Sequence, residues 1–282
     1  MFSNWRKQSK NTARRGSGPR NRENTMATSQ DVDYIVRDHT AWLTMNRPSV
    51  LNALSKGMFR GLELTLASAS NDPAVHIIVI RGEGRAFSAG LDVKEVSGFA
   101  TRKEARDFVY RLVKPFWRRL FECEKPILSV VDGPAYGAGA EIALASDIVI
   151  ASTRSTFAFS GGRVGALCCI SAGFGQFSMI GRKVVEMNLT GAALRAEEAR
   201  LFGLVSYVEE PGGIENRVAK ILDEIRLVSP TSNASFKRIR GSLITTRILN
   251  VAYKELLRTI TSPDFRTGAK AFTRKEPPDY YR

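Results

Sequence analysis

The sequence is poor in the residues that build metal centres and disulfide frameworks. Its 282 residues include only three cysteines and two histidines. Cys123, Cys168 and Cys169 show no CxxC pairing and no accompanying histidine pattern, which argues against both a zinc site and disulfide bonds. His39 and His76 stand in or beside expected strands without a neighbouring nucleophile. We therefore predict no bound metal and three small, buried thiols.

Long apolar runs are missing as well. No uninterrupted apolar stretch approaches the roughly 18 residues that a membrane-spanning helix needs. No apolar signal-peptide core stands near the N-terminus. The sequence therefore predicts a protein without a membrane partner and with a cytoplasmic location. Hydrophobic residues still make up 43% of the chain, which is enough for a sizeable core.

Acidic residues are scarce at the start of the chain. Residues 1–25 carry seven lysines or arginines against the single acid Glu23, so this segment contributes +6 of the formal net charge of +14. Because it is also almost free of apolar residues, we expect residues 1–26 to form a disordered basic tail. An Arg-rich, acid-poor start also fits a mitochondrial transit peptide. The remaining +8 suits an anionic ligand or a nucleic acid.

Apolar runs closed by glycine alternate with helical patterns over residues 27–200. An expected hairpin leads into an amphipathic helix from about Ser55 to Ser70. Nearly continuous apolar runs then predict buried strands at 75–82, 126–133, 147–152 and 156–160. Helical patterns dominate the rest of the chain. We therefore predict an α/β core over residues 27–200, followed by a C-terminal helical section over residues 201–282.

A second amphipathic helix is expected between the first two buried strands. Phe108, Leu112, Phe116 and Leu120 stand at helical spacing with basic residues between them. Pro115 interrupts this pattern, and proline in a helix interior removes a hydrogen bond. We expect a kink there.

Two glycine-rich turns each follow a buried strand. They read GEGRAFSAGLDVKE (82–95) and GPAYGAGAEIALASD (133–147). Neither completes the GxGxxG of a dinucleotide site or the GxxxxGK[ST] of a phosphate loop. Both place backbone N–H groups where a turn leads into a helix, and such groups are donors for anions and oxyanions.

These turns belong to a longer resemblance, which covers the chain from about Tyr34 to Tyr280. The sequence resembles the enoyl-CoA hydratase/isomerase, or crotonase, superfamily in five ordered blocks. The blocks are NRPSVLNALS, GRAFSAGLDVKE, KPILSVVDGPAYGAGAEIALASDIVIAS, LTGAALRAEEARLFGLVSYV and SPDFRTGAKAFTRKEPPDY. The resemblance implies a spiral of ββα units with C-terminal helices that build a homotrimer, or a hexamer of two trimers.

The resemblance also assigns roles to residues of the two turns. It implies that the N–H groups of Leu91 and Ala138 form an oxyanion hole, which stabilises the enolate of an acyl-CoA thioester. Ala138 stands where the family usually has glycine, and alanine retains the N–H group. Coenzyme A enters as part of the substrate, and no separate cofactor is expected. The residues implied to contact it are Ala89, Leu91, Asp92, Val93, Lys94, Ala138 and Lys275.

Glu141 matches the first of two glutamates with which family hydratases position and deprotonate water. A carboxylate at an apolar acyl pocket should have a raised pKa, because burial disfavours its charged form. The alternative is an exposed glutamate in the first turn of a helix, where the helix dipole favours it. The second family glutamate is replaced by Gly161. Arg163, two positions on, is expected either to line the pocket or to form a surface ion pair.

The sequence thus predicts an acyl-CoA enzyme that hydrates a 2-enoyl-CoA to a 3-hydroxyacyl-CoA. Because Gly161 leaves a single carboxylate, enoyl-CoA isomerisation or another enolate-forming reaction is the first alternative. RNA binding by the basic chain is the second alternative. A non-catalytic scaffold with the same fold is the third.

Overall fold

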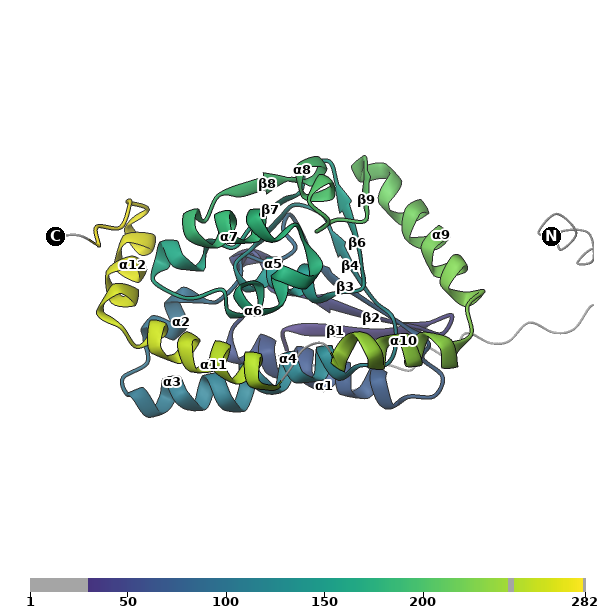
Figure 1. Cartoon of the computed structure of the whole chain (residues 1–282), viewed down its shortest axis with the longest axis horizontal. Coiled ribbons are helices and arrows are strands. Elements are labelled where there is room, and N and C mark those ends of the chain that lie inside the picture. The colour runs from purple at the N-terminus through teal and green to yellow at the C-terminus, as the bar shows by residue number, and fades with distance from the viewer. Residues whose placement is uncertain (1–29, 243–245, 281–282) are drawn as a thin grey trace, which may run out of the picture.

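The computed structural model describes residues 30–242 and 246–280 (Figure 1). The predicted tail, residues 1–26, lies outside this part. Two β-sheets are covered by helices, and a run of helices ends the chain (Figure 1). The predicted α/β class with a C-terminal helical region is confirmed.

The main sheet has six strands. They are β1 (Val32–Arg37), β2 (Thr40–Met45), β3 (Ile77–Gly82), β4 (Ile127–Val131), β6 (Ile148–Ser152) and β9 (Tyr207–Glu209). Their order is β1-β2-β3-β4-β6-β9. The β1 and β2 strands form the predicted hairpin, and all later pairings are parallel. The last strand, β9, follows residue 201, so the segment expected to be helical also supplies one edge of this sheet.

A smaller sheet lies beside the main one. It consists of β5 (Pro134–Tyr136), β7 (Thr156–Ala158) and β8 (Ala193–Arg195), in the order β5-β7-β8. Both β5 and α5 lie within the second glycine-rich turn, residues 133–147. The α5 helix contacts β5 of the smaller sheet and β4 of the main sheet.

Helices cover both sheets and complete the chain (Figure 1). No helix of the described residues is long and apolar enough to cross a lipid bilayer. The α-helices are α1 (Lys56–Asn71), α2 (Val93–Ser97), α3 (Arg102–Phe108), α4 (Lys114–Glu122), α5 (Ala138–Ala145), α6 (Cys169–Ser178), α7 (Gly181–Thr190), α8 (Ala196–Leu201), α9 (Ile214–Arg226), α10 (Pro230–Ser242), α11 (Thr246–Ile260) and α12 (Pro263–Arg274). Short 3-10 segments are η2 (Pro48–Val50), η4 (Ser160–Val164) and η5 (Pro211–Gly213).

Both faces of the main sheet are buried. Successive side chains of a strand point to opposite faces. In β3, Ile78 and Ile80 belong to the large core, whereas Ile77 and Val79 pack in a smaller cluster with residues of α9. This two-sided burial explains why the strand is an almost continuous apolar run.

The α1 helix begins where the sequence predicts it. The Ser55 hydroxyl accepts a hydrogen bond from the N–H of Met58 at 3.0 Å, so it caps the first turn. The helix buries Phe59, Leu62 and Leu66, among others, on one face. The predicted helix from Ser55 to Ser70 is thus confirmed, with Ser55 as its cap.

The second predicted helix is divided by a π-helical turn. This turn, η3 (Val109–Val113), lies between α3 and α4, immediately before Pro115. Proline has no N–H to offer the carbonyl one turn earlier, and a π turn is one way in which a helix accommodates such a break. The expected irregularity near Pro115 therefore takes the form of a change in helical winding.

A buried ionic cluster joins α10 to the main sheet. The Lys237 side chain is only 4% exposed, and its Nζ donates to Asp147 Oδ2 at 2.6 Å and to Oδ1 at 2.8 Å. Arg240 donates to the same carboxylate at 2.7 Å. The carboxylate also accepts the N–H of Ile127 at the start of β4. The Asp147 carboxylate thus binds two cationic side chains of α10 and the backbone N–H at the start of β4.

We expect Asp147→Ala to lower the free energy of unfolding by about 3–5 kcal/mol, because it leaves the buried Lys237 without its counter-charge. Urea unfolding measures this change. The matched control is Glu124→Ala, which breaks an ion pair with Arg238 in which both side chains are about half exposed. The control should stay within about 0.5 kcal/mol of the wild type. Equal effects of the two substitutions would contradict a structural role for the cluster.

Candidate active site

The two glycine-rich turns pack backbone to backbone. Ser88 and Ala135 form an isolated parallel bridge, and the N–H of Tyr136 donates to the Ser88 carbonyl at 2.8 Å. Gly90 has a positive φ of 85°. A Cβ on Gly90 would lie 2.5 Å from the Tyr136 carbonyl oxygen and 3.2 Å from the nitrogen of Ala138. Only glycine permits this approach.

The approach brings together the two N–H groups that were expected to form an oxyanion hole. Leu91 directly follows Gly90, and Ala138 is the first residue of α5. Neither N–H has an acceptor among the residues that the structure describes, whereas those of Ala89, Gly90, Asp92 and Gly137 are all bonded. The start of α5 also adds the positive end of the helix dipole. Two unpaired donors in adjacent turns can bind a single oxyanion.

Glu141 lies one turn after Ala138 in α5, and it is buried. Only 2% of the residue is exposed, so the alternative of an exposed first-turn glutamate is wrong. Its Oε1 accepts hydrogen bonds from the N–H groups of Ile170 and Ser171, both at 2.8 Å. These N–H groups belong to the first turn of α6. The carboxylate therefore bonds the N-terminus of a helix other than its own.

Burial raises the pKa of Glu141 from 4.5 to about 7. The hydrogen bonds from Ser171 and Ile170 act in the opposite direction, because they stabilise the charged form. Burial also raises the pKa of the thiols of Cys168 and Cys169, and the charge of Glu141 adds to that effect. A carboxyl group that titrates near neutral pH can both accept and donate a proton.

The position of the second family glutamate has no room for a side chain. A Cβ on Gly161 would lie 2.8 Å from the Ala166 carbonyl oxygen and 2.9 Å from Cys168 Sγ. The N–H of Gly161 donates to the same sulfur at 3.3 Å. Arg163 lies at the surface, where its Nε donates to the Thr190 carbonyl at 3.1 Å. Of the two positions that carry glutamate in family hydratases, only position 141 therefore has a carboxylate in the described structure.

The expected coenzyme A contacts lie on and around α2. Asp92 caps α2 by accepting from the N–H of Glu95, and its carboxylate also pairs with Arg47 at 3.0 Å. Val93 is buried, Ala89 is partly buried and Lys94 is exposed. These residues follow Leu91 directly or precede it closely. Their contact with coenzyme A stays a prediction.

Lys275 lies at the end of α12, in the left-handed conformation with φ 58°. The α12 helix packs against α2 and η4 of the same chain. Tyr280, which follows it, donates to the Arg163 carbonyl at 2.9 Å. The chain thus folds its own C-terminal helix over the segment that contains Gly161.

Sequence reasoning missed Ser171 of α6, which binds Glu141, and Tyr253 of α11, whose pKa Glu141 affects. Ser171 binds Glu141 through its N–H, while its hydroxyl is bonded to the Cys168 carbonyl and to Asn188. Tyr253 of α11 is 1% exposed, and burial raises its pKa, with smaller electrostatic contributions from Cys169 and Glu141. An aromatic residue on the buried side of a helix is the only sequence signal for Tyr253.

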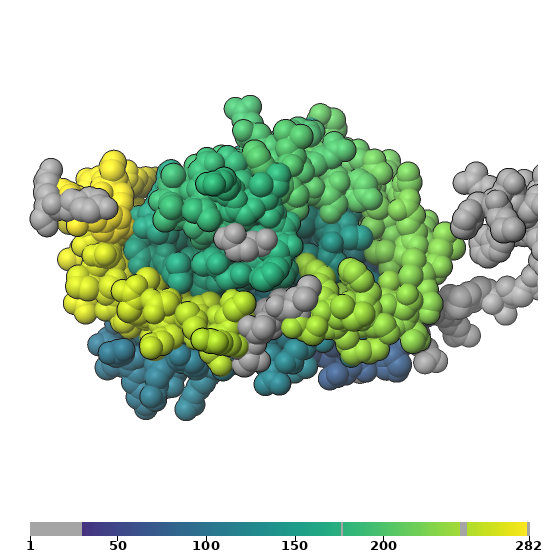
Figure 2. All heavy atoms as spheres, viewed as in Figure 1, coloured from purple at the N-terminus to yellow at the C-terminus, as the bar shows by residue number. Residues whose placement is uncertain are grey.

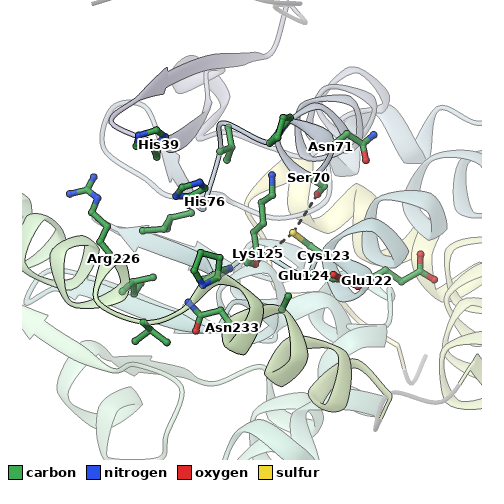
Figure 3. Close-up of a pocket in the computed structure, with 18 of the residues that line it drawn as sticks. His39, Ser70, Asn71, His76, Glu122, Cys123, Glu124, Lys125, Arg226 and Asn233 are labelled. Atoms are coloured by element: carbon green, nitrogen blue, oxygen red, sulfur yellow. Dashed lines mark hydrogen bonds between the residues drawn. The ribbon is translucent and has the colours of Figure 1, made fainter. Parts of the chain in front are cut away.

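A cavity of about 800 Å³ lies near the N-terminal ends of the strands β3 and β4, opposite the ends from which the glycine-rich turns leave (Figure 3). Its lining includes His76 and Pro126, which precede β3 and β4, whereas the glycine-rich turns follow those strands. Lys125 in this cavity donates to the Ala69 and Asp72 carbonyls, both at 2.6 Å. The Lys125 ammonium group therefore binds carbonyl groups at the C-terminal end of α1. Glu141 is not among the residues that line this cavity. Among the described residues, no group of three His, Cys, Asp or Glu can hold a metal ion.

Comparison with known proteins identifies the family and the fold. A family model for enoyl-CoA hydratase/isomerase matches residues 37–282. The (E)-benzylidenesuccinyl-CoA hydratase of Thauera aromatica is 30% identical over 255 residues, which cover 88% of this chain and 98% of that protein. The mitochondrial enoyl-CoA hydratase of Pongo abelii is 29% identical over 90% of both chains. The crystal structure of an enoyl-CoA hydratase from Mycobacterium avium subsp. paratuberculosis superposes with a TM-score of 0.78 at 26% identity, over 90% of this chain and all of that chain.

The chain therefore belongs to the enoyl-CoA hydratase/isomerase family, and it is an enzyme of that family. Its mixed α/β fold with C-terminal helices is that of the crotonase structures. The resemblance found in the sequence is thus confirmed.

The raised pKa of Glu141 predicts a pH-dependent stability. Between pH 4.5 and about 7 the folded chain holds a proton on Glu141 that the unfolded chain has released. Stability contributed by this group therefore falls as pH rises through that window, by about 3 kcal/mol in total. Glu141→Gln keeps an acceptor for the α6 N–H groups but cannot ionise.

Urea unfolding at pH 5 and pH 8 tests this expectation. The difference in stability between Glu141→Gln and the wild type should grow in favour of the variant as pH rises. A constant difference would show that Glu141 titrates at its ordinary pKa.

Proposed function

We propose that this enzyme acts on acyl-CoA thioesters and hydrates a 2-enoyl-CoA to a 3-hydroxyacyl-CoA. The observation that carries the proposal is the pair of unpaired N–H groups on Leu91 and Ala138, with buried Glu141 one turn along α5. The name of the Thauera aromatica relative, a hydratase of an enoyl-CoA, points to the same reaction class.

In this mechanism the thioester oxygen accepts both N–H groups and becomes an enolate oxygen as the reaction proceeds. The Glu141 carboxylate takes a proton from water while the water oxygen bonds to C3. The electron pair of the C2–C3 double bond moves to the enolate. The protonated Glu141 then returns a proton to C2, and the enolate electrons form that C–H bond. One carboxyl group of pKa about 7 serves both transfers.

Isomerisation is the second candidate, and the crowding at Gly161 favours it. With no side chain possible at Gly161 in this backbone, one carboxyl group must serve as both base and acid. Migration of the double bond needs only one such group. Glu141 removes a proton from C2 and delivers it to C4, with the same enolate between the two steps. Water takes no part in that reaction.

Coenzyme A binding is proposed for the segment that runs on from the first turn, with Ala138 from the second turn. Ala89, Leu91, Asp92 and Val93 would contribute chiefly backbone contacts, since the Asp92 carboxylate is already bonded. Lys94 and Lys275 are exposed cations that suit phosphate groups.

We propose a homotrimer, which two trimers can extend to a hexamer. The α6, α7, α10 and α11 helices lie on the face shown in Figure 2, and they carry many exposed apolar side chains. Apolar residues gathered in this way mark interfaces between proteins. They are Phe177, Val185, Leu189, Phe236, Ile239 and Val251, together with Ile180 between α6 and α7.

A cytoplasmic location is proposed, with mitochondria as the alternative. The Pongo abelii relative is named as a mitochondrial protein. Import of a reporter protein fused to residues 1–25 into mitochondria would favour the mitochondrial location.

Ala138→Pro tests the oxyanion hole. Proline removes the N–H group but is well tolerated at the first position of a helix, which Ala138 occupies in α5. We expect turnover of short 2-enoyl-CoA thioesters to fall about 10²- to 10³-fold. The control is Ala138→Gly, which keeps the N–H and should retain activity. Glu141→Gln should abolish turnover in the same assay.

The same panel of 2-enoyl-, 3-enoyl- and 3-hydroxyacyl-CoA thioesters separates the candidate functions. Migration of the double bond without hydration would replace hydratase by isomerase. Tight binding without conversion of any member would leave a non-catalytic scaffold. Salt-sensitive RNA binding in place of acyl-CoA binding would indicate the nucleic-acid alternative.

Light scattering coupled to gel filtration tests the oligomer. The wild type should elute with three times the mass of one chain, or six times. Leu189→Glu combined with Ile239→Glu should yield monomers, because charges would be buried in the interface. Leu64→Glu on α1, where the residue is 50% exposed, is the control and should leave the oligomer intact. A monomeric wild type would overturn the proposal.

A further inference from the structure

The hydroxyl group of Tyr253 is buried without a hydrogen-bond partner. Tyr253 is 1% exposed, and no atom of the described residues bonds its oxygen. The hydroxyls of Tyr136 and Tyr280 are bonded instead, to Thr156 at 3.0 Å and to the Arg163 carbonyl at 2.9 Å. A buried hydroxyl without a partner costs free energy, and such a group calls for an explanation.

The position of Tyr253 relates this hydroxyl to Glu141. The α11 helix packs against α6, and the first turn of α6 holds the Glu141 carboxylate. Burial raises the pKa of the Tyr253 phenol, and the electrostatic effects of Cys169 and Glu141 add to the shift. The hydroxyl therefore stays protonated at neutral pH, and it remains a hydrogen-bond donor.

The hydroxyl of Ser171, the residue whose N–H binds Glu141, is already occupied. The Ser171 hydroxyl is bonded to the Cys168 carbonyl at 3.1 Å and to Asn188 Oδ1 at 2.9 Å. Gly161 has no side chain to offer. Tyr253 therefore supplies an unpaired hydroxyl donor on the helix that packs against α6.

We propose that the Tyr253 hydroxyl hydrogen bonds the oxygen at C3 of the acyl group, both as the attacking water and as the hydroxyl of the product. The inference rests on the proposed function, and it names the preferred ligand as an acyl-CoA that carries oxygen at C3. Tyr253 donates its hydrogen bond to this oxygen and keeps its own proton. Glu141 takes the proton that the oxygen loses as its bond to C3 forms.

Ligand binding tests the proposal without turnover. The Glu141→Gln variant provides a background in which 3-hydroxybutyryl-CoA is not dehydrated. Calorimetry compares the affinity of this ligand with that of butyryl-CoA, which lacks the C3 oxygen. We expect about a tenfold preference for the hydroxylated ligand, since one hydrogen bond to a buried donor has about that effect. Adding Tyr253→Phe should reduce the preference to within about twofold.

Thermal unfolding distinguishes this role from a structural one. Tyr253→Phe in the wild-type background should leave the melting temperature unchanged or raised, because it removes an unpaired hydroxyl, yet it should lower kcat about tenfold. Tyr34→Phe is the matched control. Tyr34 is 4% exposed and lies on β1, away from α6 and α11, so this variant should retain kcat and the ligand preference.

The outcomes separate the inference from the proposed function. An unchanged ligand preference in Tyr253→Phe would overturn the inference and leave acyl-CoA chemistry intact. Marked destabilisation by Tyr253→Phe would show that the hydroxyl holds the fold and would likewise overturn it. Failure of both thioesters to bind the parent protein would overturn the proposed function, and the inference with it.

Discussion

The close approach of the two glycine-rich turns is the constraint on which the rest of this site depends. A side chain at Gly90 would strike the Tyr136 carbonyl, and one at Gly139 would lie 2.6 Å from the Ser88 carbonyl. Without these side chains the backbones meet, and two N–H groups are left without acceptors in the described chain. The same contact determines where α5 begins, and hence where Glu141 is buried.

Glu141 links the parallel sheet region to the C-terminal half of the chain. Its carboxylate bonds the start of α6, and α6 in turn packs against α11. Burial raises its pKa, while the two N–H donors keep the charged form accessible. A proton can therefore move on and off this group near neutral pH without any second carboxylate. In the proposed function, this one carboxyl group would replace the pair of glutamates that family hydratases use.

Much of this architecture could be predicted from local sequence. The apolar runs predicted the central strands, and Ser55 predicted the start of α1. The assignment of Leu91 and Ala138 as oxyanion donors stays a prediction. The edge strand β9, the π turn at η3 and the position of Tyr253 could not be predicted. Their placement depends on partners distant in sequence, such as β6 for β9, and on the way a long helix adapts to Pro115. The predicted coenzyme A contacts depend on a ligand, so neither sequence nor fold decides them.

Two adjacent buried thiols at the start of α6 allow local opening of this turn to be measured by alkylation. Cys168 and Cys169 are 4% and 2% exposed, and their pKa values are raised. Alkylating reagents need both access and thiolate, so these sulfurs react only through transient openings of the protein. Cys169 directly precedes Ile170 and Ser171, whose N–H groups bind Glu141, so an opening of this turn would affect both. The rate at which Cys169 is alkylated therefore reports how often the first turn of α6, which binds Glu141, opens in the native protein.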